Sequence, residues 1–192
     1  MTSDEELFRQ WQQGNRQALE TLVERYQYRL LSHLYSLVGN VKTAEDLVQE
    51  TFIRLIRDAQ SYHYPRPFFP WIYTIARNLA FNHQASAYHR HVELGVSLPE
   101  SLAGEPELET RVEDSDQRQY LQAALAQLSF EQREVISLRF HQEMDIKHVA
   151  TLLGIPEGTV KSRTFQALLR LRQYLEDNSL QERFEREDEN DE

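Results

Sequence analysis

The chain has 192 residues, 40% of them hydrophobic, and a formal net charge of −10. This length accommodates one medium domain or two small helical ones, and the apolar content is typical of a globular protein rather than a disordered one. No run of about 18 apolar residues is present, so we expect no membrane-spanning helix and no insertion into a membrane. The acidic N-terminus lacks the apolar segment of a secretory signal, which favours a cytoplasmic location. The absence of cysteine excludes disulfides, thiolate metal ligands and cysteine nucleophiles.

The negative charge is concentrated in two segments. Residues 93–116 hold eight acids and one base, and residues 176–192 hold nine acids and two bases, so each segment carries −7 and the remainder carries +4. The stretch 158–175 contains four bases and no acid. Because attraction to phosphate acts over about 8–10 Å at ordinary salt, such a stretch can bind DNA locally in a chain that is acidic overall.

Apolar residues at helical spacing predict a bundle of helices in residues 1–91. Gly39 is expected to end the second of them. Pro65 and Pro67 forbid a continuous helix between the third and the fourth, so a stiff loop is expected over 62–67. The predicted helices cover residues 7–12, 19–37, 44–59 and about 68–80.

The segment 92–116 breaks the helical pattern, because glycine and proline lie among its acids, and we expect it to be a flexible interdomain linker. Helical spacing resumes at residue 120, which predicts a second helical domain over 117–177. The acidic tail, 178–192, is too poor in apolar residues to pack and is expected to be disordered. It could also shield the basic stretch before it from DNA. The fold class predicted from the sequence is therefore all-α, with two small helical domains.

Residues 144–168 have the pattern of a helix-turn-helix. Val149 and Ala150 lie on the inner side of a first helix, Gly154 suits the turn, and Pro156 suits the start of a second helix. The second helix separates an apolar side that includes Ala167 and Leu168 from a polar side. The polar side carries Thr159, Ser162, Arg163 and Gln166, and Lys161, Arg170 and Arg172 flank it.

Hydroxyl, guanidinium and amide groups on one side of a helix are those that read base edges and phosphates in the major groove. An ordinary helical hairpin with a solvated polar side has the same pattern. The shared positive sign of the charges favours DNA, since a solvated helix more often mixes signs.

An enzyme is not expected. His83, His89 and His91 cluster at the end of the fourth predicted helix, but no carboxylate or cysteine completes a good metal site. Neither a glycine-rich phosphate loop nor a serine, histidine and acid arrangement is apparent. We therefore expect no catalytic residue, no metal and no cofactor.

Three motifs in order resemble those of extracytoplasmic-function (ECF) sigma factors, group IV of the superfamily that includes the housekeeping sigma factor. Residues 44–55, AEDLVQETFIRL, resemble the polymerase-binding helix of the sigma-2 domain, and residues 70–80, PWIYTIARNLA, its promoter-melting helix. Residues 128–140, LSFEQREVISLRF, and residues 158–163, GTVKSR, resemble the sigma-4 domain. The resemblance implies a factor that binds core RNA polymerase and directs promoter-specific initiation by reading −10 and −35 elements.

The resemblance also implies roles for individual residues and partners. The expected partners are the β′ clamp helices and β flap of the polymerase, promoter DNA, and an anti-sigma factor. Residues implied in polymerase binding are Glu45, Asp46, Gln49, Glu50 and Arg54. Residues implied at the −10 element are Tyr64, Arg66, Arg77, Asn78, Asn82 and His83. Residues implied at the −35 element are Thr159, Lys161, Ser162, Arg163, Gln166 and Arg170.

Two departures from the family pattern have expected consequences. Thr43 stands where an aspartate is frequent, and it is expected to cap the polymerase-binding helix instead. Gln166 stands where arginine is common, which predicts an altered −35 preference and a weaker dependence on salt. A helix-turn-helix regulator that binds DNA without polymerase is the alternative to a sigma factor.

Overall fold

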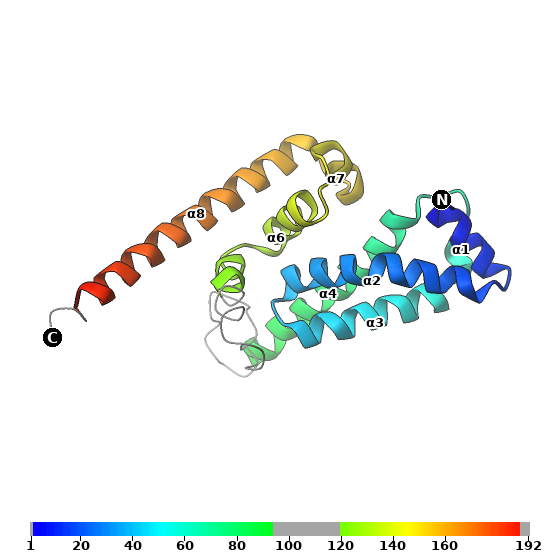
Figure 1. Cartoon of the computed structure of the whole chain (residues 1–192), viewed down its shortest axis with the longest axis horizontal. Helices are drawn as coiled ribbons and strands as arrows, with labels where there is room; N and C mark the ends of the chain where they lie inside the picture. The colour runs from blue at the N-terminus through cyan, green and yellow to red at the C-terminus, as the bar shows by residue number, and fades with distance from the viewer. Residues whose placement is uncertain (1, 94–119, 189–192) are drawn as a thin grey trace. The chain divides into compact units, whose positions relative to one another are not determined.

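The computed structural model describes residues 2–93 and 120–188, and their side chains over 2–86 and 120–178. All regular structure in these ranges is helical, which confirms the predicted fold class, and the chain divides into two compact units, Met1–Leu98 and Pro99–Glu192 (Figure 1). The predicted linker lies outside the described residues apart from its first two. Among the described helices, none combines the length and hydropathy needed to cross a bilayer.

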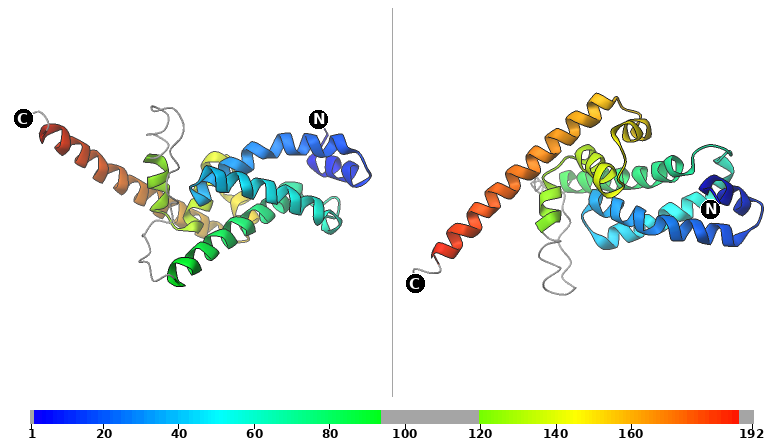
Figure 2. Two further views of the ribbon diagram at one scale, coloured as in Figure 1. Left: turned by 90° about the horizontal axis from the view of Figure 1, so that it is seen from below. Right: turned by 45° about the horizontal axis from the view of Figure 1, so that its top comes forward.

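The first unit is a helical bundle. Helices α2, α3 and α4 pack pairwise against one another, and the short α1 packs against α2 and α4 (Figure 2). A 3-10 turn, η1, precedes the proline-containing loop. The elements are α1 (Asp4–Gln12), α2 (Arg16–Val38), α3 (Val41–Arg57), η1 (Ala59–Ser61) and α4 (Phe68–Glu93).

Local sequence sets the junction between α2 and α3. Gly39 adopts a left-handed φ of 75° and ends α2, as the sequence predicts. Asn40 is the N-cap of α3, because its side chain accepts a hydrogen bond of 2.8 Å from the backbone N–H of Thr43. The expectation that Thr43 caps this helix was therefore wrong. The helix begins three residues earlier than the motif suggested, and asparagine is a better N-cap than threonine.

Aromatic side chains form the core where α1, α4 and the proline loop meet. The ring of Phe8, which is fully buried, lies 4.9 Å from Tyr62 and 5.1 Å from Trp71, centroid to centroid. The Tyr62 hydroxyl donates to the carbonyl of Arg66 across the loop. Tyr62 is therefore a core residue that fixes the conformation of the loop.

In its described residues, the second unit has a helix over residues 120–126 followed by four helical elements, of which η2 is a π-helical turn. Residues of the first helix, α6 and α8 share one buried cluster that includes Leu125, Ile136 and Ala167. Helix α6 begins with a capping box, in which Ser129 and Gln132 each bond the backbone of the other. The elements are α6 (Phe130–Ile136), η2 (Ser137–His141), α7 (Ile146–Leu153) and α8 (Glu157–Asp188).

Helix α8 is longer than the sequence pattern suggested. It continues to Asp188, whereas we expected a tail without regular structure from residue 178. Residues 159–188 contain neither glycine nor proline and are rich in glutamate, arginine, glutamine and leucine, which all favour a helix. An ion pair of 2.7 Å between Arg172 and Glu176, one turn apart, adds to this preference. Residues 189–192 lie outside the described part of the chain.

Candidate nucleic-acid and polymerase interfaces

The helix-turn-helix is formed as the sequence predicts. Asp145 caps α7 by accepting the backbone N–H of His148 at 2.8 Å, and this hydrogen bond lowers the pKa of its carboxyl. Gly154 ends α7 with a φ of 65°. Val149 from α7 and Val160 from α8 are fully buried. The two helices are thus held together through their apolar sides, which leaves the polar side of α8 outward.

Five of the six −35 candidates lie on that polar side. Ser162, Gln166 and Arg170 are exposed, whereas Thr159 and Arg163 are half-buried. The Ser162 hydroxyl donates to the carbonyl of Thr159 at 3.1 Å. Because successive residues of a helix are about 100° apart, these five cover roughly one third of its circumference. The structure therefore presents a continuous strip of hydroxyl, amide and guanidinium groups.

Lys161, the sixth candidate, lies on a neighbouring side of α8 together with Arg172 and Phe165. Phe165 is 69% exposed, and Leu168, which the periodicity predicted in the core, is 45% exposed. Leu168 lies at the edge of the buried strip, about 80° round the helix from Val160. Sequence reasoning missed Phe165, although its position, three residues after Ser162 and four after Lys161, places it one turn from a hydroxyl and a cation.

Two −10 candidates lie in the loop before α4, and α1 holds this loop in place. Tyr64 is 49% exposed, and the guanidinium carbon of Arg9 lies 4.9 Å from its ring centroid. Gln12 donates to the carbonyl of Ala59 at 2.8 Å. Arg66 is exposed. The loop therefore presents one aromatic ring and one cation from a fixed backbone.

Three further −10 candidates share one side of α4. Asn78 and Asn82 are exposed and Arg77 is half-buried. Phe81 lies between them and is 48% exposed, an aromatic group that sequence reasoning missed although it follows Arg77 by four residues and Asn78 by three. Arg77, Asn78 and Asn82 span about 140° of the helix circumference, and the exposed His83 lies at least about 100° beyond either end of that arc, so it lies on another side. The side chains of His89 and His91 lie outside the described residues.

The polymerase-binding candidates lie along the outer side of α3. Glu45, Asp46 and Gln49 are exposed. Glu50 and Arg54 form an ion pair of 2.7 Å, and each is a little over a third exposed. A pair this accessible to water stabilises the helix by less than about 1 kcal/mol. The opposite side of α3 is buried through Ala44, Leu47, Thr51 and Leu55.

Two isoleucines extend this outer side toward the end of α3. Ile53 is 56% exposed and Ile56 is 48% exposed. An apolar residue at helical spacing, such as Ile56, is usually in the core, but α3 buries only a narrow strip because one of its sides faces solvent. The outer side of α3 therefore combines carboxylates with exposed aliphatic groups.

Comparison with known proteins matches both units. Residues 22–89 match the family described as Sigma-70 region 2, and residues 124–173 match Sigma-70, region 4. The first match contains α3 and most of α4, and the second contains α6, α7 and the start of α8.

Named relatives agree with these matches. The ECF RNA polymerase sigma factor BldN of Streptomyces coelicolor is 34% identical over 91% of this chain and 66% of BldN. The ECF RNA polymerase sigma factor SigL of Mycobacterium tuberculosis is 35% identical over 83% of this chain and 89% of SigL. Among solved structures, the sigma factor RpoE in complex with the anti-sigma factor NepR from Bartonella quintana has a TM-score of 0.61 at 28% identity, over 82% of this chain and 96% of RpoE.

Proposed function

The chain belongs to the extracytoplasmic-function RNA polymerase sigma factors, and from this premise we propose how its two units divide polymerase binding and promoter recognition. As a sigma factor it directs promoter-specific initiation of transcription by RNA polymerase. We assign the nucleotide chemistry to the polymerase and not to this chain, and we place the chain in the cytoplasm, where that polymerase acts.

The outer side of α3 binds core RNA polymerase in this proposal. Glu45, Asp46 and Gln49 are exposed, and the opposite side of the helix packs in the core. These three side chains therefore do not contribute to the packing of the bundle. Carboxylates at the surface attract a basic partner and fix its orientation. The β′ clamp helices are the partner that we assign to them.

The loop before α4 and the outer side of α4 hold the opened −10 element. Capture of single-stranded DNA requires flat groups that stack on bases, together with donors for phosphates and base edges. Tyr64 and Phe81 supply exposed rings, and Arg66, Arg77 and Asn78 supply donors. We assign Asn82 to the same surface, whereas His83 lies on another side of α4 and would contact DNA only at the edge of this surface.

The polar side of α8 reads the −35 element from the major groove. Gln166 is suited to adenine, because its amide can donate to and accept from that base, and Arg163 is suited to guanine or to phosphate. Lys161 and Arg170 contact the DNA backbone. We also assign to the second unit the contacts with the β flap of the polymerase.

An anti-sigma factor is a further partner in this proposal. RpoE of Bartonella quintana was solved in complex with the anti-sigma factor NepR, and that chain is 28% identical to this one. The exposed isoleucines of α3 and the exposed Phe165 of α8 are apolar surfaces on which such a partner would compete with polymerase.

The observation that carries the proposal is the exposure of two strips of suitable chemistry, on α3 and on α8, each within the segment that matches the corresponding sigma region. Transcription in vitro with bacterial core polymerase on a randomised promoter library tests it. We expect defined start sites downstream of a shared −10 and −35 pair.

A charge-reversed variant tests the polymerase-binding side. Glu45→Lys combined with Asp46→Lys should abolish binding to core enzyme, whereas Glu20→Lys, an equally exposed change on α2, should leave it unaltered. A protein that fails to bind core polymerase, or that protects promoter DNA equally well without it, would be the DNA-binding regulator and not a sigma factor.

A further inference from the structure

Helix α8 has an apolar strip on its exposed surface, formed by Phe165, Leu168 and Leu175. Phe165 is 69% exposed, and each of the two leucines is a little under half exposed. Arg172 lies between the leucines, so the four residues follow one another at intervals of three, four and three and lie within about 80° of the helix circumference. The fully buried Ala167 lies on another side. The strip therefore has the spacing of the seam between two paired helices.

The two parts of α8 carry opposite charge. Residues 158–175, the basic part, contain four bases and no acid, a net of +4, whereas residues 176–188, the acidic part, contain six acids and two bases, a net of −4. The four bases are centred near residue 166 and the six acids near residue 182, which places the two centres about 24 Å apart on a continuous helix. Apart from pairs near the junction, such as Arg172 with Glu176, the two parts are too distant to neutralise each other within one copy.

The basic part makes the contacts that join α8 to the rest of its unit. Ala167 and Leu171 pack in the buried cluster, and the ring of Tyr174 lies 6.0 Å from that of Tyr120. The acidic part, orange to red in Figure 1, extends past α6 and α7. Because an isolated helical segment of about 12–15 residues is only marginally stable in water, a second helix packed alongside would stabilise it.

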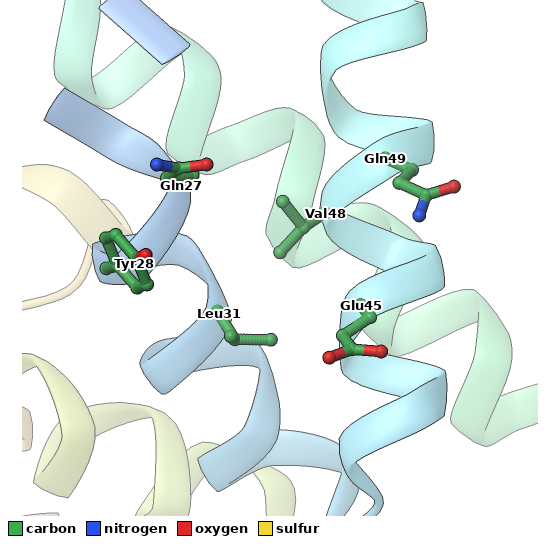
Figure 3. Close-up of a pocket in the computed structure, with 6 residues that line it drawn as sticks. All are labelled: Gln27, Tyr28, Leu31, Glu45, Val48 and Gln49. Atoms are coloured by element: carbon green, nitrogen blue, oxygen red, sulfur yellow. The ribbon is translucent and has the colours of Figure 1, made fainter. Parts of the chain in front are cut away.

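The exposed apolar groups of the first unit have different neighbours. Tyr28 and Leu31 border a groove between α2 and α3 that is open to solvent (Figure 3). The polar residues that line it are Gln27, Glu45 and Gln49, an acid and two amides without a base. Two copies of such a surface have no opposite charges to pair. The surface of α8 carries both signs, which makes it complementary to itself.

We propose that α8 of the free chain pairs with α8 of a second copy in antiparallel orientation. The basic part of each helix then lies beside the acidic part of the other, and the two apolar strips meet. A two-fold axis makes both contacts at once, because each copy supplies both charges. With the bases centred near residue 166 and the acids near residue 182, the axis passes near residue 174, next to Leu175.

The pairing changes how the free chain interacts with DNA. Acids of one copy lie beside Lys161 and Arg172 of the other, so a paired chain attracts DNA phosphate less than a single copy does. The association is weak, because the strip has three apolar side chains in each copy and a standard interface has about 20–30 residues on each side. We expect a dissociation constant on the order of 10 μM.

Sedimentation equilibrium of the full chain tests the pairing. Dimers should form at about 0.05 M salt and dissociate more readily at about 0.5 M, where screening reduces the attraction between the charged parts. Phe165→Ala combined with Leu175→Ala should weaken dimerisation by about tenfold or more, because the strip loses most of its apolar area. Truncation after residue 180, which removes most of the acids, should have a similar effect. Gln173→Ala, at an exposed position on another side of α8, is the control and should dimerise as the unaltered chain does.

Disulfide formation distinguishes the two possible orientations, since the chain has no cysteine of its own. Leu175→Cys should crosslink two copies, because the axis brings these residues together. Leu168→Cys should not, because the two copies of residue 168 lie about 20 Å apart along an antiparallel pair and a disulfide spans less than about 7 Å between Cα atoms. In a parallel pair both variants would crosslink.

Three results would overturn the proposal. The first is a chain that remains monomeric at about 100 μM, tenfold above the expected dissociation constant. The second is a dimer that persists unchanged when Phe165 and Leu175 are both replaced by alanine. The third is crosslinking of Leu168→Cys as readily as of Leu175→Cys. Because the replaced residues are exposed, the melting temperature of each variant, measured at a concentration where the chain is monomeric, should match that of the unaltered chain.

Discussion

Glu5 accepts a hydrogen bond of 3.0 Å from the backbone N–H of Phe68, and this bond joins the first turn of α1 to the first residue of α4. The first N–H groups of a helix have no acceptor within it, so a carboxylate at this point serves as a cap that comes from a distant part of the sequence. The preceding residue, Asp4, accepts the hydroxyl of Tyr26 and pairs with Arg25. Two consecutive acids thus connect α1 to both α2 and α4.

We expect Glu5→Ala to destabilise the first unit by about 1 kcal/mol, because the N–H of Phe68 loses its acceptor in a partly buried position. For a unit of this size the midpoint of thermal unfolding should fall by about 4–8 °C. Glu5→Gln keeps an acceptor oxygen, so its midpoint should fall less. Glu20→Ala, at an exposed position of α2, should unfold at the same midpoint as the unaltered chain. Equal midpoints for Glu5→Ala and Glu20→Ala would show that the cap contributes nothing.

The burial of Tyr62 predicts a loss of stability at alkaline pH. Burial, together with the nearby charge of Glu5, raises the pKa of the Tyr62 hydroxyl to about 12. A raised pKa in the folded state means that the protonated phenol stabilises the fold fully below about pH 10, the ordinary pKa of tyrosine. This contribution is then lost as the pH rises through about 12. Tyr26 has a pKa raised in the same direction by burial and by its bond to Asp4.

Denaturant unfolding of the unaltered chain and of Tyr62→Phe, measured at a series of alkaline pH values, tests this expectation. The free energy of unfolding should fall more steeply with pH for the unaltered chain, because phenylalanine cannot ionise. The variant should be less stable at neutral pH, since it lacks the bond to the carbonyl of Arg66. Parallel slopes for the two proteins would contradict the assigned pKa.

Replacement of Gln166 tests how α8 reads DNA. Gln166 is exposed in the middle of the polar side, so Gln166→Arg adds a cation that can contact guanine or phosphate. We expect a changed base preference at one −35 position, and a salt dependence of promoter binding that steepens by about 0.9 in log–log slope for one added phosphate contact. The holoenzyme with Gln17→Arg, which adds the same charge to α2, should show neither change. If Gln166→Arg changes neither the base preference at the −35 element nor the salt dependence of promoter binding, Gln166 does not contact DNA.

Phe81 predicts an effect on promoter opening. A base stacked on an aromatic ring contributes about 1–3 kcal/mol, so Phe81→Ala should reduce the yield of open complex by roughly fivefold or more. Phe81→Trp preserves an aromatic ring and should retain most of the yield of open complex. Binding of the duplex promoter at low temperature, before opening, should be unaffected. If Phe81→Ala opens promoters normally while Asn78→Ala does not, the outer side of α4 acts through hydrogen bonds alone.

The sequence was sufficient to predict the helices, and also their ends where a nearby residue such as glycine terminates the helix. Gly39 and Gly154 both adopt the left-handed φ that the pattern required, at 75° and 65°. The burial of Val149 and Ala150 on α7 followed from periodicity. The exposed residues of the interface motifs lie outward as the motifs indicated, with His83 turned to another side of its helix.

Other features depended on contacts that the sequence does not show. The bond between Glu5 and Phe68 joins positions far apart in the chain, and no local pattern indicates it. The exposure of Phe81 and Phe165 could not be read from a hydrophobic residue at helical spacing, because such a residue is usually in the core. The groove beside Tyr28 arises only when α2 and α3 pack together.

The length of α8 determines whether the acidic end of the chain can shield the basic part of the helix. The sequence alone allowed this end to fold back and shield the basic part of α8 from DNA. In a continuous helix the rise is about 1.5 Å per residue, so residue 182 lies about 15 Å along the axis from Arg172. This exceeds the distance of about 8–10 Å over which charges interact at ordinary salt. Glu176, which pairs with Arg172 on the same helix, lies within this distance and precedes the acidic residues from 182 onward.

Truncation after residue 180 therefore should not change DNA affinity by more than about twofold at ordinary salt, even though it removes seven acids and two bases. It retains Glu176 and so leaves the pair with Arg172 intact. Promoter binding by holoenzymes with the full and the shortened chain, measured over a range of salt concentrations, provides the comparison. If affinity rises on truncation and the gain disappears as salt is added, the acidic end reaches the basic part of α8, which a helix that continues to Asp188 does not permit.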